Sequence, residues 1–245
     1  MEAILAVGAE PFFTDIDPKT WQMPIGNWSN QAVVVCHLYG GVSSAVKSKA
    51  RLLYEDTSQS FGGKFNEQLL GTFSRASAIS FYPTKNLSAI GDAGVVITAD
   101  VDLAYRIRAI CNHGQTRPQL HNYRGTTGRL DELQAAILKE KLRRFDRFVV
   151  KRKQIAQFYL DHIRDLPLKL PEQIPGSFSV PNTFVVRTHA REELQEFLHS
   201  RGILTGIHYP TPIHKMPAYR SESWLKYICL KQKIYVRKFS LCPFG

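Results

Sequence analysis

The sequence predicts an α/β protein with a mostly parallel sheet, on three observations. Four short apolar runs have the length of strands: residues 33–38, 52–54, 76–81 and 95–98. Helical periodicity appears at 102–110 and through most of 131–163. Two of the apolar runs end in carboxylates, a hydroxyl and an amine. In an open α/β sheet, ligands bind just beyond the carboxyl ends of the strands.

The first run is continuously apolar, which predicts a strand buried on both faces. The polar connection Ser43–Lys49 that follows is barely long enough for a crossover helix. Residues 102–110 predict an amphipathic helix with Leu103, Ile107 and Ile110 on one face.

Residues 131–163 contain no Pro or Gly and predict helix, whereas the breakers at 166–176 mark a domain junction. We therefore expect a large α/β domain over residues 1–165 and a small α+β domain over residues 166–245. The small domain should contain a strand at 182–187, a helix at 190–201 with Leu194, Phe197 and Leu198 inward and Gly202 as C-cap, and a strand at 203–208.

Composition indicates a soluble cytoplasmic protein. The 245 residues are 44% hydrophobic and 22% charged, which is ordinary for a globular protein able to bury a core. The four cysteines are scattered without zinc-ligand spacing and are interpreted as reduced thiols. No stretch approaches the length of a membrane span.

The net charge of +11 is unusual and concentrates in the second half of the chain. Eight basic residues lie between positions 139 and 153: Lys139, Lys141, Arg143, Arg144, Arg147, Lys151, Arg152 and Lys153. Such a cluster can attract a polyanion. It can also form the solvated face of a helix whose opposite face is apolar, here Leu133, Ile137, Leu142, Phe145, Phe148 and Val149. We favour the solvated face.

The polar groups at the strand ends suggest one particular chemistry. Glu55 and Asp56 follow one apolar run, and Ser80 and Lys85 follow the next. An amine, a carboxylate and a hydroxyl are what pyridoxal phosphate needs for its aldehyde, its ring nitrogen and its phosphate. The alternative is a surface lysine after a buried strand and an acid at a strand end. The residues alone favour that alternative.

A family resemblance reverses this preference. Five segments occur in order: His37–Gly40, Glu55–Gln59, Ser80–Leu87 with Gly91–Gly94, Asn112–Gln115 and Arg129–Leu138. Together they resemble the DegT/DnrJ class of sugar-nucleotide aminotransferases, which are fold-type I enzymes that use pyridoxal phosphate. That fold pairs a large, mostly parallel α/β domain with a small C-terminal domain. The resemblance runs from about Ala3 to Tyr219 and more weakly to Pro243.

The resemblance implies roles for four residues. Lys85 matches the lysine that forms the imine with the cofactor and later moves the proton. Asp56 matches the acid at the ring nitrogen, and only one of Glu55 and Asp56 can face the ring because adjacent strand residues point to opposite faces. Gln59 matches the residue beside the ring hydroxyl, and Ser80 matches a phosphate ligand.

Other matches are looser. Thr127 stands where the family usually has an asparagine that binds the phosphate in the neighbouring subunit, and it can still offer a hydroxyl. Arg129 belongs to the same segment, and His208 and Tyr209 resemble residues near the substrate entrance. For His37 two interpretations stay open: a pocket residue, or a histidine satisfied at a strand end.

The resemblance implies transamination of a keto sugar nucleotide to an amino sugar nucleotide, with glutamate as donor, in a homodimer. The match begins in mid-domain and stops before the family's last helix, so we expect a chain truncated at both ends. The alternative is therefore a catalytically incomplete homologue that needs a missing N-terminal segment. A nucleic-acid-binding module ranks last, because no recognition motif accompanies the basic cluster.

Overall fold

The computed structural model describes residues 1–219 and 239–240, which form two compact units. The first unit comprises Met1–Pro24, Tyr159–Glu172 and Thr183–Gly245, and the second comprises Ile25–Phe158 and Gln173–Asn182. The units interleave along the chain, and the domain boundary expected at residue 165 stays a prediction. Most of the basic segment after residue 219 lies outside the described residues.

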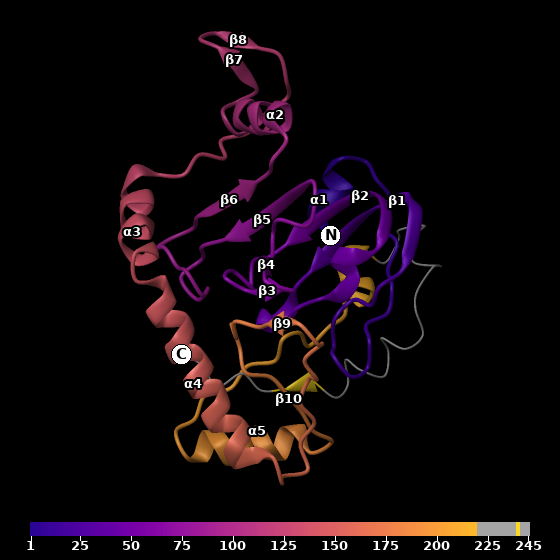
Figure 1. The fold of residues 1–245 in the computed structure, drawn as a ribbon, viewed down its shortest axis with the longest axis vertical. Coiled ribbons are helices and arrows are strands. Elements are labelled where there is room, and N and C mark those ends of the chain that lie inside the picture. Colours follow the sequence, from indigo (N-terminus) through magenta and orange to yellow (C-terminus); the bar gives the residue numbers. More distant parts are fainter. Residues whose placement is uncertain (220–238, 241–245) are drawn as a thin grey trace. The chain divides into compact units, whose positions relative to one another are not determined.

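A four-stranded sheet organises the second unit and confirms the four predicted strands (Figure 1). Its order is β1-β2-β5-β6, where the strands are β1 (Asn27–Cys36), β2 (Lys49–Asp56), β5 (Ala76–Ser80) and β6 (Gly94–Ile97). β1, β2 and β5 are parallel, and β6 is antiparallel to β5. The carboxyl ends of the three parallel strands therefore meet at one edge.

The expectation that the first strand is buried on both faces is wrong. Val33 and Val35 are 6% and 0% exposed, whereas Val34 between them is 48% exposed. Side chains alternate between the two faces of a strand, so only one face of β1 is covered. On the neighbouring strands the covered face carries Glu55 and Ile79.

Short elements connect the strands. The link between β1 and β2 forms two 3-10 turns, η1 (Leu38–Gly40) and η2 (Ser44–Lys47), instead of a crossover helix. A second, three-stranded sheet of order β4-β3-β9 was not predicted. Its strands have two residues each: β3 (Lys64–Phe65), β4 (Gln68–Leu69) and β9 (Ser177–Phe178).

The predicted helix at 102–110 is confirmed as α2 (Val101–Cys111), which begins where the Asp100 side chain accepts a hydrogen bond from Leu103 N–H at 2.9 Å. Of its predicted inward residues, Ile110 is exposed. A hairpin of β7 (Gln115–Arg117) and β8 (Leu120–His121) follows.

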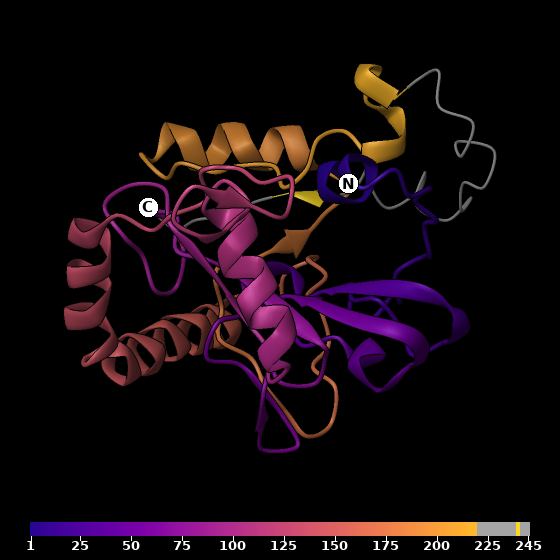
Figure 2. The same ribbon diagram turned by 90° about the horizontal axis from the view of Figure 1, so that it is seen from above.

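Two consecutive helices, α3 (Glu132–Leu142) and α4 (Phe145–Ile163), confirm the prediction for 131–163 and meet at a bend (Figure 2). Their buried side chains pack with β5 and the segments after it into one core: Ile79, Phe81, Leu87, Ala89, Leu138, Phe145, Val149 and Val180. The predicted apolar face is only partly inward, since Leu133 and Leu142 are 65% and 52% exposed.

The first unit contains α1 (Glu2–Ala6), β10 (Val186–Arg187) paired with β11 (Phe239–Ser240), α5 (Arg191–Ser200), η3 (Ile213–Lys215) and η4 (Pro217–Tyr219). The helix predicted at 190–201 is confirmed, with Gly202 at φ +77° beyond its end. The strand predicted at 182–187 is confirmed only at Val186–Arg187. Two expectations are wrong: Phe197 is 50% exposed, and residues 203–208, all of them described, form no strand.

Candidate active site

The candidate site lies where the three parallel strands end. Cys36, Asp56 and Ser80 are the last residues of β1, β2 and β5. In the sheet register Cys36 pairs with Asp56, and Asp56 pairs with Ala78. Chain folding thus brings a thiol, a carboxylate and a hydroxyl to one edge, as expected for a ligand site in an α/β sheet.

Asp56 contacts groups on both sides. Its carboxylate accepts hydrogen bonds from the Ser58 N–H at 3.0 Å and from the Ser58 hydroxyl, and Cys36 is its neighbour on the adjacent strand. Desolvation and the Asp56 charge raise the pKa of the Cys36 thiol to about 12, although the residue keeps exposed surface, while the Lys85 ammonium acts in the opposite direction. Asp56 and Lys85 therefore lie within electrostatic reach of the same thiol.

Glu55 points to the other face of β2 and is buried. Its carboxylate accepts hydrogen bonds from Gly71 N–H at 2.7 Å, Ser74 hydroxyl at 2.8 Å and Phe73 N–H at 3.0 Å, with His37 Nε2 at 3.3 Å. Desolvation acts to raise the pKa of Glu55, but the hydrogen bonds from His37, Gly71 and Ser74 outweigh it and lower the pKa. Glu55 is thus a satisfied carboxylate on the covered face.

His37 is fully buried and satisfied at the strand end, which is the second of the two interpretations left open for it. Its Nδ1 accepts a hydrogen bond from Ser43 N–H at 3.0 Å. Since Nδ1 is the acceptor, the ring proton of the neutral histidine is on Nε2, which donates to Glu55.

Gln59 is held by the turn after β1. Its amide oxygen accepts a hydrogen bond from Tyr39 N–H at 2.6 Å. Tyr39 has a φ of +63°, and Gly40 follows at φ +88°. A Cβ on Gly40 would lie 2.2 Å from the Val180 carbonyl oxygen, so this close approach requires glycine.

The loop that carries Lys85 is anchored at several points. Lys85 N–H donates to the Tyr82 carbonyl at 2.9 Å, and Asn86 Nδ2 donates to the Val180 carbonyl at 3.0 Å. From α3, Lys141 Nζ donates to the carbonyl of Ser88 at 2.7 Å and to its hydroxyl at 3.1 Å. These contacts fix the loop on both sides of Lys85.

Of the remaining predicted site residues, Ser80 lies at this edge and the others lie elsewhere. Ser80, at the edge, accepts a hydrogen bond from Tyr82 N–H at 3.3 Å. Thr127 and Arg129 are exposed in the segment between β8 and α3, where the Thr127 hydroxyl is 3.3 Å from His113 Nε2. His208 and Tyr209 belong to the first unit.

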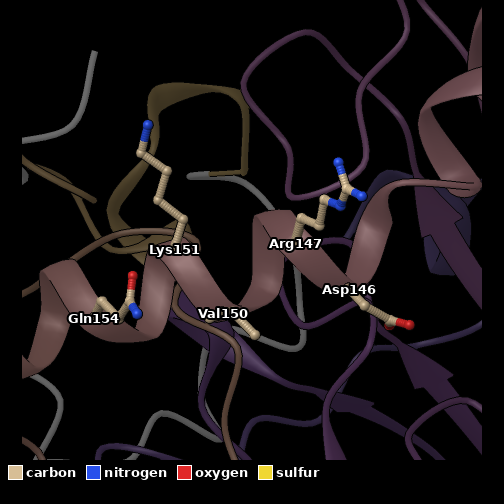
Figure 3. A pocket seen from close by; sticks show the side chains of 5 residues that line it. All are labelled: Asp146, Arg147, Val150, Lys151 and Gln154. Atoms are coloured by element: carbon tan, nitrogen blue, oxygen red, sulfur yellow. The ribbon is translucent and has the colours of Figure 1, made fainter.

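The basic cluster has partners within the second unit. Arg143 and Arg144 pair with Glu140, Lys141 binds Ser88, Arg152 donates to the carbonyls of Pro181 and Asn182, and Lys153 lies 3.7 Å from the centre of the Phe178 ring. Arg147 and Lys151 project from one side of α4 beside a shallow hollow that Asp146, Val150 and Gln154 also line (Figure 3). These contacts favour a structural role for most of the cluster.

Sequence reasoning missed two features of the site. The composition identifies Cys36 only as a scattered thiol, and the apolar run 33–38 does not show that the strand ends at Cys36. Lys141 was treated as part of a solvated face, and nothing local in the sequence links it to Ser88, 53 residues away.

The fold and this edge define the class: the chain has fold type I of the pyridoxal-phosphate-dependent transferases. It belongs to the DegT/DnrJ/EryC1/StrS aminotransferase family, whose profile matches residues 1–242. In the described part of the chain, no helix is long and apolar enough to cross a membrane.

Several curated relatives match. The chain is 43% identical to the erythromycin biosynthesis sensory transduction protein EryC1 of Saccharopolyspora erythraea, over 77% of this chain and 53% of the relative. It is 36% identical to the dTDP-3-amino-3,4,6-trideoxy-alpha-D-glucose transaminase of Streptomyces venezuelae, over 99% and 68%. The UDP-N-acetyl-3-dehydro-alpha-D-glucosamine 3-aminotransferase of Acidithiobacillus ferrooxidans is 34% identical, over 91% and 64%.

Solved structures agree with this assignment. An aminotransferase of this family from Brucella abortus superposes with a TM-score of 0.85 at 29% identity, covering 100% of this chain and 70% of the other. DesV of S. venezuelae gives 0.82 at 36% identity, covering 88% and 60%. The chain thus spans between half and two thirds of the length of most of the relatives named here.

Proposed function

We propose that this protein transfers an amino group from glutamate to a keto sugar nucleotide, with pyridoxal phosphate as cofactor. The observation that carries the proposal is the edge of the sheet, where the Asp56 carboxylate ends β2 and the anchored loop that carries Lys85 follows the neighbouring strand β5. An acid and an amine at neighbouring strand ends are the two groups that this cofactor requires of a protein.

The substrate class follows from the relatives. Two of them are named as a dTDP-sugar transaminase and a UDP-sugar aminotransferase, at 36% and 34% identity. A nucleotide-linked sugar is therefore the shared substrate chemistry. Glutamate as the donor rests on the family resemblance.

The donor set at the edge fits the cofactor. The Lys85 amine would hold its aldehyde, Asp56 would face its ring nitrogen, Gln59 its ring hydroxyl and Ser80 its phosphate, while Thr127 would reach the phosphate in the partner's site. Bound there, pyridoxal phosphate would supply the electron sink for breaking the bond between the donor's α-carbon and its hydrogen. Glu55 is excluded from the ring position because its four hydrogen bonds hold it on the opposite face.

The side chains would then divide the work. Lys85 Nζ would take the proton from the α-carbon of the donor and deliver it to the cofactor carbon that bore the aldehyde, as an amine next to both carbons can. The Asp56 carboxylate would keep a proton on the ring nitrogen by its negative charge. The Gln59 amide, which Tyr39 N–H already orients, would contact the cofactor's ring hydroxyl and hold the ring in one orientation.

Assembly and location complete the proposal. We propose a homodimer in which Thr127 and Arg129 reach the partner's site, with His208 and Tyr209 near the sugar nucleotide. The exposure of Thr127 and Arg129 supports this role, because buried side chains could not reach another subunit. We place the protein in the cytoplasm, which suits its free thiols Cys36 and Cys111.

The test is the amino-transfer half-reaction. Purified protein with added pyridoxal phosphate should develop an absorption band that glutamate converts to that of the pyridoxamine form, with formation of 2-oxoglutarate. Lys85→Ala should show neither change. A wild-type protein that produces no 2-oxoglutarate above the Lys85→Ala background would contradict the proposal.

A further inference from the structure

Beside the acid proposed for the cofactor lies a buried polar network that the proposed chemistry does not use. It consists of His37 and Glu55 with the four other groups that bind them, and both side chains are fully buried. Burying a carboxylate is costly unless it is fully hydrogen-bonded, so such a network needs a structural or functional reason.

The network joins three segments around Asp56. Through Ser43 N–H and His37 it holds the turn after β1, and through Gly71, Phe73 and Ser74 it holds the loop before β5. Glu55 is the point where the two meet.

The backbone of β2 carries this constraint to the site. His37 N–H donates to the Asp56 carbonyl at 3.1 Å, so His37 holds both Glu55 and Asp56. The same turn presents Tyr39 N–H to Gln59 at 2.6 Å. Two of the side chains proposed to face the cofactor ring thus depend on the turn that His37 anchors.

We propose that His37 and Glu55 are positioning residues that fix the Asp56 carboxylate against Cys36 at the end of β2. The inference rests on the proposed function for its purpose, since Asp56 is the acid proposed for the cofactor's ring nitrogen. The proposed effect of His37 and Glu55 on the position of Asp56 does not depend on the cofactor. It predicts that weakening the bond between His37 and Glu55 loosens Asp56 from the Cys36 thiol in the cofactor-free protein.

Two near-isosteric substitutions separate the bonds of His37. His37→Asn keeps an acceptor near the position of Nδ1 for Ser43 N–H but loses the donor to Glu55. His37→Gln places an amide N–H near the position of Nε2 and restores that donor. Each variant loses one of the two bonds of His37: His37→Asn loses the bond to Glu55, and His37→Gln loses the bond from Ser43 N–H, so the two rates assign an effect to one bond or the other.

The readout is the rate at which iodoacetamide alkylates Cys36 in cofactor-free protein, followed by mass spectrometry of its peptide. Cys36 is paired with Asp56 in the sheet, and desolvation together with the charge of that carboxylate raises the pKa of the Cys36 thiol to about 12. Each unit by which this pKa falls increases the thiolate tenfold and the alkylation rate about threefold, because a less basic thiolate is less nucleophilic. We expect His37→Asn to react at least about threefold faster, and His37→Gln to react near the wild-type rate.

Two control variants show whether a faster alkylation of Cys36 is due to the network. Asp56→Asn removes the charge directly and should also accelerate alkylation of Cys36. Phe145→Leu loosens the core of the same unit without touching the network, and it should leave the rate within about twofold. Equal acceleration by Phe145→Leu and His37→Asn, or none with His37→Asn, would overturn the inference.

Should His37→Asn fail to fold, Ser74→Ala takes its place, since it removes one donor to Glu55 and leaves the backbone donors intact. It is expected to accelerate alkylation in the same direction, and an unchanged rate would overturn the inference. A wild-type protein that binds no pyridoxal phosphate would refute the proposed function and leave the thiol result valid.

Discussion

Replacement of Glu55 by glutamine tests how much the buried carboxylate stabilises the protein. Oε1 accepts from Gly71 N–H and His37, and Oε2 accepts from Phe73 N–H and Ser74. A glutamine must place its NH₂ group at one of these two positions, where it meets a backbone N–H.

The less costly orientation puts the NH₂ group at the Oε2 position. The Ser74 hydroxyl lies 2.9 Å from the Ala76 carbonyl, so it can turn its single proton to that carbonyl and accept from the amide, whereas Phe73 N–H loses its partner. One unsatisfied donor costs about 1–3 kcal/mol. We therefore expect Glu55→Gln to lower the free energy of unfolding at pH 7 by about 1–3 kcal/mol.

The pH dependence of the difference in stability between wild type and Glu55→Gln tests this reasoning. The folded-state pKa of Glu55 lies below its ordinary value of 4.5, so its stabilising contribution is complete above about pH 4.5 and is lost as the pH falls through the folded value. In urea titrations followed by tryptophan fluorescence, the difference between wild type and Glu55→Gln should shrink in acid. A difference that is absent at pH 7, or that stays constant on acidification, would refute the reasoning.

Further predictions concern the supports of the site. Lys141→Met should lower the free energy of unfolding by about 1–3 kcal/mol, because it removes the donor to the Ser88 carbonyl. Limited proteolysis should then cut the loop around Ser88 faster than in wild type, and equal rates of cutting would contradict this contact. Gly40→Ala should destabilise the protein far more than Gly202→Ala, measured as urea midpoints, because a Cβ at Gly202 meets nothing within 4 Å; similar shifts would argue against the close packing. Phe145→Ala should cost about 3–5 kcal/mol in the same titrations, and a cost below about 1 kcal/mol would mean that its ring is not in the core. Duplex DNA should show no steep salt-dependent binding, and a slope of several units in a plot of log K against log salt would revive a role in binding polyanions.

Elements with strong local patterns were predicted well from the sequence. The helices α2, α3, α4 and α5 have 3.6-residue periodicity or breaker-free length, and all four lie within the predicted ranges to within a residue or two. The cores of β1, β2, β5 and β6 were found from short apolar runs. Family motifs then selected Asp56 and Lys85 among many acids and lysines.

Features set by distant contacts were not predictable. The exposure of Val34 and Phe197 depends on what covers a face, and an apolar run does not carry this information. The strands β3, β4 and β9 have two residues each, too few for any periodicity. Three donors to Glu55 come from residues 16 to 19 positions later in the chain, so only the fold reveals that Glu55 is held on the covered face of β2.

The measurement that tests the central claim most directly is covalent trapping of the cofactor on one lysine. The protein is incubated with pyridoxal phosphate, reduced with borohydride and digested, and the modified lysine is identified by mass spectrometry, with Lys85→Ala treated in parallel. We expect modification of Lys85 at cofactor concentrations that leave the other lysines unmodified, and loss of the saturable adduct in Lys85→Ala. Adducts spread over several surface lysines, at the same level in both proteins, would contradict the assignment of Lys85.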